Sequence, residues 1–88
     1  MKIMIVDDNP AVRRMLKSIV GSLAEEIYEC TDGSEALTAY SLHHPDYVLM
    51  DIAMGQVDGI AATRQIVSAD PLANVIMVTN YDETDLRE

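Results

Sequence analysis

Short runs of consecutive apolar residues alternate along the chain with longer stretches in which apolar positions recur at helical spacing. The runs are strand-length and several are rich in β-branched residues, so we expect strands at residues 2–6, 26–30, 46–51 and 74–78. The runs at residues 2–6 and 46–51 lack polar alternation, which is typical of strands covered on both faces, and residues 74–78 form a fourth apolar run. Residues 26–30 alternate enough to predict a half-exposed edge strand.

The clearest helix follows the first strand. Asn9 can cap its amino end, and Pro10 suits the first helical position, where its missing N–H costs nothing. Three- and four-residue steps then place one apolar stripe on the helix, formed by Val12, Met15, Leu16, Ile19, Val20 and Leu23. The solvent side carries Arg13, Arg14 and Lys17, and Gly21 suggests that the helix ends nearby.

Two weaker helices are expected further on. A turn at residues 31–34, with Ser34 as helix cap, precedes a helix whose modest apolar face is Ala36, Leu37 and Tyr40, and which closes at residues 43–45. Residues 52–59 form a loop, in which Asp58 and Gly59 suit a turn. The third helix covers residues 60–68, with Ile60 and Val67 on one side.

The order of strands and helices predicts a parallel sheet with helices on both faces, because the connections are long enough for crossovers. In such a sheet the carboxyl ends of all strands lie at one edge, which is where open α/β sheets bind ligands. We therefore expect four polar residues that follow strands to meet there: Asp7, Asp8, Asp51 and Thr79.

Three converging carboxylates would repel one another unless a cation lay among them or their pKa values rose. An all-oxygen ligand set suits Mg²⁺, and a carboxylate such as Asp51 can act as a nucleophile that forms an acyl phosphate. Thr79 could then hydrogen-bond the phosphoryl oxygens. Taken singly, each of these residues is more simply explained as a turn former after a strand.

Composition narrows the class of protein. The 88 residues allow one domain, and the net charge of −9 argues against direct binding to a nucleic-acid backbone. Cys30 is the single cysteine, so no internal disulfide can form, and we expect it to be a small buried hydrophobe. No leader or long apolar span interrupts the pattern, which predicts a cytoplasmic protein without membrane contact.

Three motifs together resemble the receiver domain of two-component response regulators. They are the strand ending in Asp7 and Asp8, the run Val48–Met54 followed by Asp58 and Gly59, and the run Val75–Thr79. The resemblance covers nearly the whole chain, and three separated motifs in the right strand context are far more specific than one.

The resemblance implies a flavodoxin-like doubly wound sheet of order 2-1-3-4-5, with residues 1–88 as a single, C-terminally incomplete receiver domain that lacks strand 5 and the last helix. It implies that Asp51 accepts a phosphoryl group from a histidine kinase or phosphotransfer protein. Mg²⁺ would be held by Asp8, Asp51 and the backbone carbonyl of Ala53, with Asp7 acting through water, and Thr79 would move toward the phosphate. Such a domain assists its own phosphorylation and switches partner binding, but it is not a turnover enzyme.

The chain also departs from the family pattern. Gly55 replaces the proline that usually stiffens its loop, Asn80 stands where a small residue is usual, and the family's terminal lysine has no counterpart. Without strand 5, residues 74–78 would form an exposed apolar edge, which predicts self-association. Two alternatives stay open: an unphosphorylated interaction or dimerisation module, and a phosphatase, which is disfavoured because Ala53 stands where such enzymes place a general acid.

Overall fold

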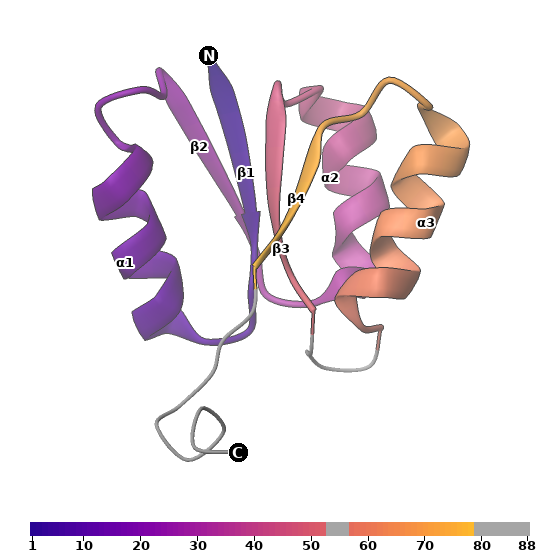
Figure 1. Ribbon diagram of the computed structural model, residues 1–88, viewed down its shortest axis with the longest axis horizontal. Helices are drawn as coiled ribbons and strands as arrows, with labels where there is room; N and C mark the ends of the chain where they lie inside the picture. The colour runs from indigo at the N-terminus through magenta and orange to yellow at the C-terminus, as the bar shows by residue number, and fades with distance from the viewer. Residues whose placement is uncertain (53–56, 79–88) are drawn as a thin grey trace.

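The computed structural model describes residues 1–52 and 57–78 of the chain. These residues form a parallel sheet of order β2-β1-β3-β4, with helices on both faces (Figure 1). The strands are β1 (Lys2–Val6), β2 (Glu26–Cys30), β3 (Tyr47–Asp51) and β4 (Val75–Val78). The helices are α1 (Pro10–Val20), the short 3₁₀ turn η1 (Gly33–Glu35), α2 (Ala36–His43) and α3 (Gly59–Ala69). The predicted flavodoxin-like sheet is confirmed.

Helix α1 covers one face of the sheet, and α2 and α3 cover the other (Figure 1). Successive residues of a strand point to opposite faces, so β1 contributes to both sides of the core. The smaller apolar cluster, on the α1 side, contains Ile3, Ile5 and Leu49. The larger cluster lies between the sheet and the helix pair and contains Met4, Val6, Cys30, Ala36, Tyr40, Val48, Met50, Ala62 and Ile66.

The predicted start of α1 is confirmed. Its predicted apolar stripe, however, is only partly buried against the sheet. The Asn9 Oδ1 atom accepts hydrogen bonds from the backbone N–H groups of Ala11 and Val12, at 2.8 and 3.3 Å. Within the stripe, Leu16 and Val20 pack against the smaller core cluster. Three other members keep more than half of their surface exposed: Met15, Ile19 and Leu23.

The predicted cap of the second helix is wrong. Asp32, not Ser34, caps the segment, because its carboxylate accepts a hydrogen bond from the backbone N–H of Ser34 at 3.2 Å and opens the turn η1 before α2. The predicted end of α2 is confirmed. His44 adopts a left-handed conformation, with φ of 48°, and its N–H donates to the Tyr40 carbonyl at 2.8 Å.

Helix α3 begins one residue earlier than predicted, and it buries a different side. The Asp58 carboxylate caps it by accepting a hydrogen bond from the Ala61 N–H at 2.8 Å. Its buried residues are Gly59, Ala62 and Ile66, whereas Ile60 and Val67 are exposed. Small residues let α3 approach the sheet closely, so the larger apolar residues beside them remain outside.

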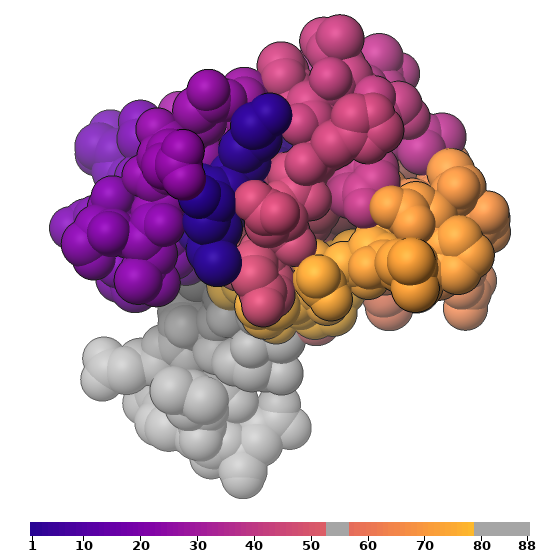
Figure 2. Space-filling model, turned by 90° about the horizontal axis from the view of Figure 1, so that it is seen from above, coloured from indigo at the N-terminus to yellow at the C-terminus, as the bar shows by residue number. Residues whose placement is uncertain are grey.

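The amino-terminal edge of the sheet, seen from above in Figure 2, is closed by polar contacts. The N-terminal ammonium lies 2.6 Å from a Glu25 carboxylate oxygen, and this hydrogen bond lowers the pKa of Glu25. An Asp46 carboxylate oxygen accepts a hydrogen bond from the Lys2 backbone N–H at 2.7 Å. None of the described helices has the length and apolar character needed to cross a membrane.

Candidate functional site

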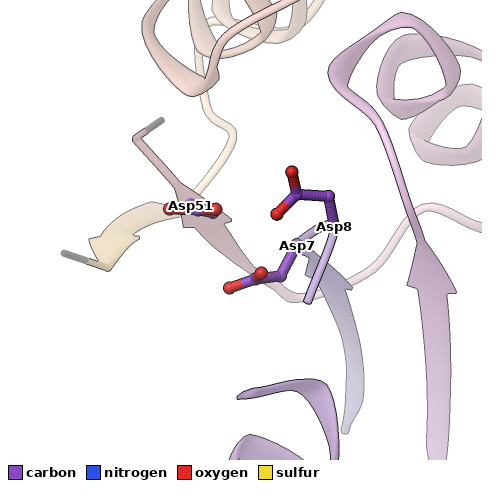
Figure 3. Close-up of side chains that lie close together, drawn as sticks. All are labelled: Asp7, Asp8 and Asp51. Carbon is purple, nitrogen blue, oxygen red and sulfur yellow. The ribbon is translucent and has the colours of Figure 1, made fainter. Parts of the chain in front are cut away.

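Three carboxylates meet at the carboxyl edge of the sheet. Asp7 directly follows β1, and Asp51 is the last residue of β3. These two strands are parallel neighbours with Val6 opposite Met50, so their register carries Asp7 and Asp51 to adjacent places. One oxygen from each of Asp7, Asp8 and Asp51 lies within 4.8 Å of the others (Figure 3).

The cluster is partly buried, and one Asp7 oxygen has no hydrogen-bond partner in the part of the chain that the structure describes. Asp7 and Asp51 are only 1% and 5% exposed, whereas Asp8 faces solvent. The Asp7 Oδ1 atom accepts a hydrogen bond from the Asn9 N–H at 2.9 Å. Its Oδ2 atom is buried and has no hydrogen-bond partner among the described residues. A buried carboxylate oxygen is costly without a compensating group, so the cluster fits a hard divalent cation that takes oxygen ligands.

Gly59, which was predicted only as a turn residue, packs against the backbone of Asp51. A Cβ atom at position 59 would lie 1.8 Å from the Asp51 carbonyl oxygen, which leaves room for glycine alone. The Gly59 N–H also donates to the Ile52 carbonyl at 2.8 Å. The start of α3 is therefore pressed directly against the backbone that carries Asp51.

Arg13 was predicted to lie on the solvent side of α1, and the structure corrects this. Its Nη1 atom donates to the Asp7 backbone carbonyl at 2.7 Å, and its Nε donates to a Glu29 carboxylate oxygen at 3.0 Å. The Arg13 side chain is only 16% exposed. Helical spacing alone gave no signal for this contact, because the contact depends on how α1 sits against the ends of β1 and β2.

Two predicted site residues, Ala53 and Thr79, lie outside the described residues, as do Gly55 and Asn80. Their roles stay predictions. The β3–β4 register nevertheless pairs Asp51 with Val78, the residue that precedes Thr79 in the sequence.

A parallel sheet of this order, with paired aspartates after β1 and a third at the end of β3, defines a CheY-like receiver fold. The chain matches the family described as the response regulator receiver domain over residues 3–88, and it belongs to this family. The resemblance seen in the sequence is thus confirmed, and it places the chain in two-component signalling.

Relatives and a solved structure agree with this assignment. The chemotaxis protein CheY of Listeria monocytogenes is 44% identical over 78 residues, which cover 88% of this chain and 66% of that protein. The regulatory protein AtoC of Escherichia coli is 39% identical over 84 residues, or 96% of this chain, but only 18% of AtoC is covered. The crystal structure of the response regulator TrrA of Thermotoga maritima, in complex with Mg²⁺ and BeF, is 31% identical with a TM-score of 0.84. The match covers 97% of this chain and 76% of TrrA.

Proposed function

We propose that this chain is a cytoplasmic phosphorylation switch in which Asp51 accepts a phosphoryl group from a histidine kinase or a phosphotransfer protein. The observation that carries the proposal is the convergence of Asp7, Asp8 and Asp51 at one edge of the sheet, with a buried Asp7 oxygen that lacks a partner among the described residues. Membership of the receiver-domain family supports the same proposed function.

Phosphoryl transfer to Asp51 requires mainly that the protein position the reacting groups and balance their charge. A carboxylate oxygen of Asp51 attacks the phosphorus of the donor, and an acyl phosphate bond forms. The bond between phosphorus and the donor nitrogen or oxygen breaks, and its electron pair leaves with the donor group. In its carboxylate form Asp51 needs no general base, because no proton has to be removed from it.

The same three carboxylates fit Mg²⁺, which Asp7, Asp8 and Asp51 would hold together with the backbone carbonyl of Ala53 implied by the family. When bound, Mg²⁺ supplies positive charge that offsets the charge on the transferring phosphoryl oxygens. The structure of TrrA with Mg²⁺ and BeF supports this choice of ion for a related fold. Thr79 would then move toward the phosphoryl group and contact it, and this movement would change how the domain binds its partners.

Phosphorylation is tested by incubating the protein with Mg²⁺ and acetyl phosphate and measuring its intact mass. We expect an adduct of about 80 Da, the mass of one phosphoryl group. Asp51→Asn should abolish it, because the amide is not a nucleophile. Asp46→Asn is the matched control, since Asp46 lies just before the same strand but at the opposite edge.

The other outcomes separate the alternatives. An adduct that persists in Asp51→Asn would contradict the assignment of the acceptor. Absence of any adduct in the unaltered protein would favour an interaction module that works without phosphorylation. Rapid multiple turnover of a phosphomonoester would indicate a phosphatase instead.

We also propose self-association through β4. Among the described residues β4 is the outermost strand on its side of the sheet, and it pairs only with β3. Ile76 and Met77 are 48% and 37% exposed, so apolar surface lies on both sides of this strand. A groove of about 300 Å³ adjoins it, lined by Met1, Ile3, Val20, Leu23, Tyr47, Leu49 and Ile76. A second copy of the chain would satisfy the open strand edge and cover the groove.

The oligomeric state tests this proposal. We expect light scattering at micromolar concentration to give the mass of a dimer, and Ile76→Lys to shift the protein toward the monomer by placing a charge in the interface. Ile60→Lys is the matched control, because Ile60 is also 48% exposed but lies on α3. A monomeric mass for the unaltered protein, or equal effects of both substitutions, would count against association through β4.

A further inference from the structure

Arg13 joins three elements at the edge of the carboxylate cluster. It lies in α1, its Nη1 contacts the carbonyl of Asp7 after β1, and its Nε contacts Glu29 on β2. Its neighbour Arg14 is exposed and makes no ion pair found among the described residues. Two adjacent residues of the same type thus have very different surroundings.

The contact from Arg13 completes the anchoring of the Asp7 backbone. The Asp7 N–H donates to the Cys30 carbonyl at 3.0 Å, and the Asp7 carbonyl accepts from Arg13 at 2.7 Å. The carbonyl belongs to the peptide group that connects Asp7 to Asp8. The direction in which both carboxylates leave the backbone therefore depends on this hydrogen bond.

Only a forked side chain can make both contacts. The guanidinium group presents donors in a fixed plane, so Nη1 and Nε reach a carbonyl and a carboxylate at once, whereas an ammonium is a point charge. Glu29 is itself held by Lys17, whose Nζ lies 3.1 Å from the second carboxylate oxygen. These two cations lower the pKa of Glu29, with the hydrogen bond from Lys17 as the largest cause. The anchor on β2 thus stays ionised at neutral pH.

We infer that Arg13 is a positioning residue for the cation site: through the peptide between Asp7 and Asp8 it sets the separation of the carboxylates that bind the ion. This inference rests on the cation site of the proposed function. Arg13 does not touch the ion, and its effect passes through the backbone that it holds.

Calorimetric titration with Mg²⁺ tests the inference, because a positioning role and a simple charge effect predict opposite changes in the Mg²⁺ affinity of Arg13→Gln. Arg13→Gln should weaken Mg²⁺ binding roughly tenfold, as loss of an outer-shell partner does in metal sites. Arg13→Lys should weaken it as well, since it keeps the charge but not the fork. If charge alone mattered, removing a cation near the site would tighten Mg²⁺ binding in Arg13→Gln and leave Arg13→Lys unchanged. Arg14→Gln removes the same charge from the next residue and should leave affinity unchanged or slightly tighter.

Amide hydrogen exchange without metal gives a second readout. In Arg13→Gln the N–H groups of Asp7 and Asn9 should exchange faster, while those of Met4 and Ile5 in the middle of β1 keep their rates. A merely structural role would instead raise exchange along the whole strand. Unchanged exchange at Asp7 and Asn9, or unchanged Mg²⁺ affinity in Arg13→Gln, would overturn the inference. Failure of the unaltered protein to accept a phosphoryl group would refute the proposed function. Mg²⁺ affinity and amide exchange do not depend on phosphorylation, so they would still decide whether Arg13 positions the carboxylates.

Discussion

Replacing Gly59 with alanine is expected to destabilise the protein by more than about 3 kcal/mol, beyond the usual cost of overpacking. The added Cβ would lie 1.8 Å from the Asp51 carbonyl oxygen and 2.9 Å from the Ile52 Cα. Both neighbours are backbone atoms of the segment at the end of β3, so no side chain can rotate away. Either α3 must retreat from the sheet or the backbone of Asp51 must move.

Urea denaturation measures the free energy of unfolding. The other described glycines serve as controls, because an added Cβ would meet its nearest backbone atom at a greater distance than at Gly59. A Cβ at Gly33 would lie 2.3 Å from the Val57 carbonyl oxygen, and one at Gly21 would lie 2.8 Å from the Lys17 carbonyl oxygen. The loss of unfolding free energy should therefore fall in the order Gly59→Ala, Gly33→Ala, Gly21→Ala. An equal loss at Gly59 and Gly21 would show that the close approach of α3 to Asp51 does not limit stability.

In metal-free buffer, Asp7→Asn is expected to stabilise the protein by about 1–3 kcal/mol. Two like charges within 4.8 Å of each other repel by about 3 kcal/mol or more at the effective dielectric constant of protein sites, and the exposure of Asp8 reduces this figure. Asparagine keeps an oxygen that can accept the hydrogen bond from the Asn9 N–H, so the loop loses no contact. The variant removes the charge that the cation would otherwise balance, and its amide NH₂ group takes the place of the second carboxylate oxygen.

The free energy of unfolding should be measured with and without Mg²⁺. The unaltered protein should gain stability on adding the ion, because the ion binds only the folded site, and Asp7→Asn should lose most of that gain. Asp46→Asn is the control for net charge, since Asp46 lies at the opposite edge of the sheet and asparagine can still accept from the Lys2 N–H. Destabilisation by Asp7→Asn in metal-free buffer would contradict the view that the carboxylates repel one another.

The two central strands, β1 and β3, could be predicted from the sequence because each is buried on both faces and therefore leaves a run of apolar residues. Their parallel arrangement then placed Asp7, Asp8 and Asp51 at one edge. The side of α3 that is buried could not be predicted in this way. Apolar content favoured Ile60 and Val67, but the sheet accepts a helix at close range only where small residues such as Gly59 and Ala62 face it.

The supporting residues of the site were missed for a related reason. Arg13 has the spacing of a solvent-facing residue, and its hydrogen bonds exist only because α1, β1 and β2 end near one another. Similarly, a glycine after an aspartate suits any turn, and only the approach of α3 to Asp51 shows why no other residue fits. Both features are properties of tertiary packing, which local periodicity does not encode.

The position of β1 between β2 and β3 has a consequence for the order in which this protein folds. Its partners on both sides come later in the chain, so β1 must stay unpaired on the β3 side until residue 51 has been synthesised. Closing such non-local pairs costs chain entropy before any contact is gained, which slows folding. The carboxylate cluster therefore cannot assemble before the end of β3 has been synthesised, and a stalled chain that ends before β3 would display Asp7 and Asp8 without the third acid.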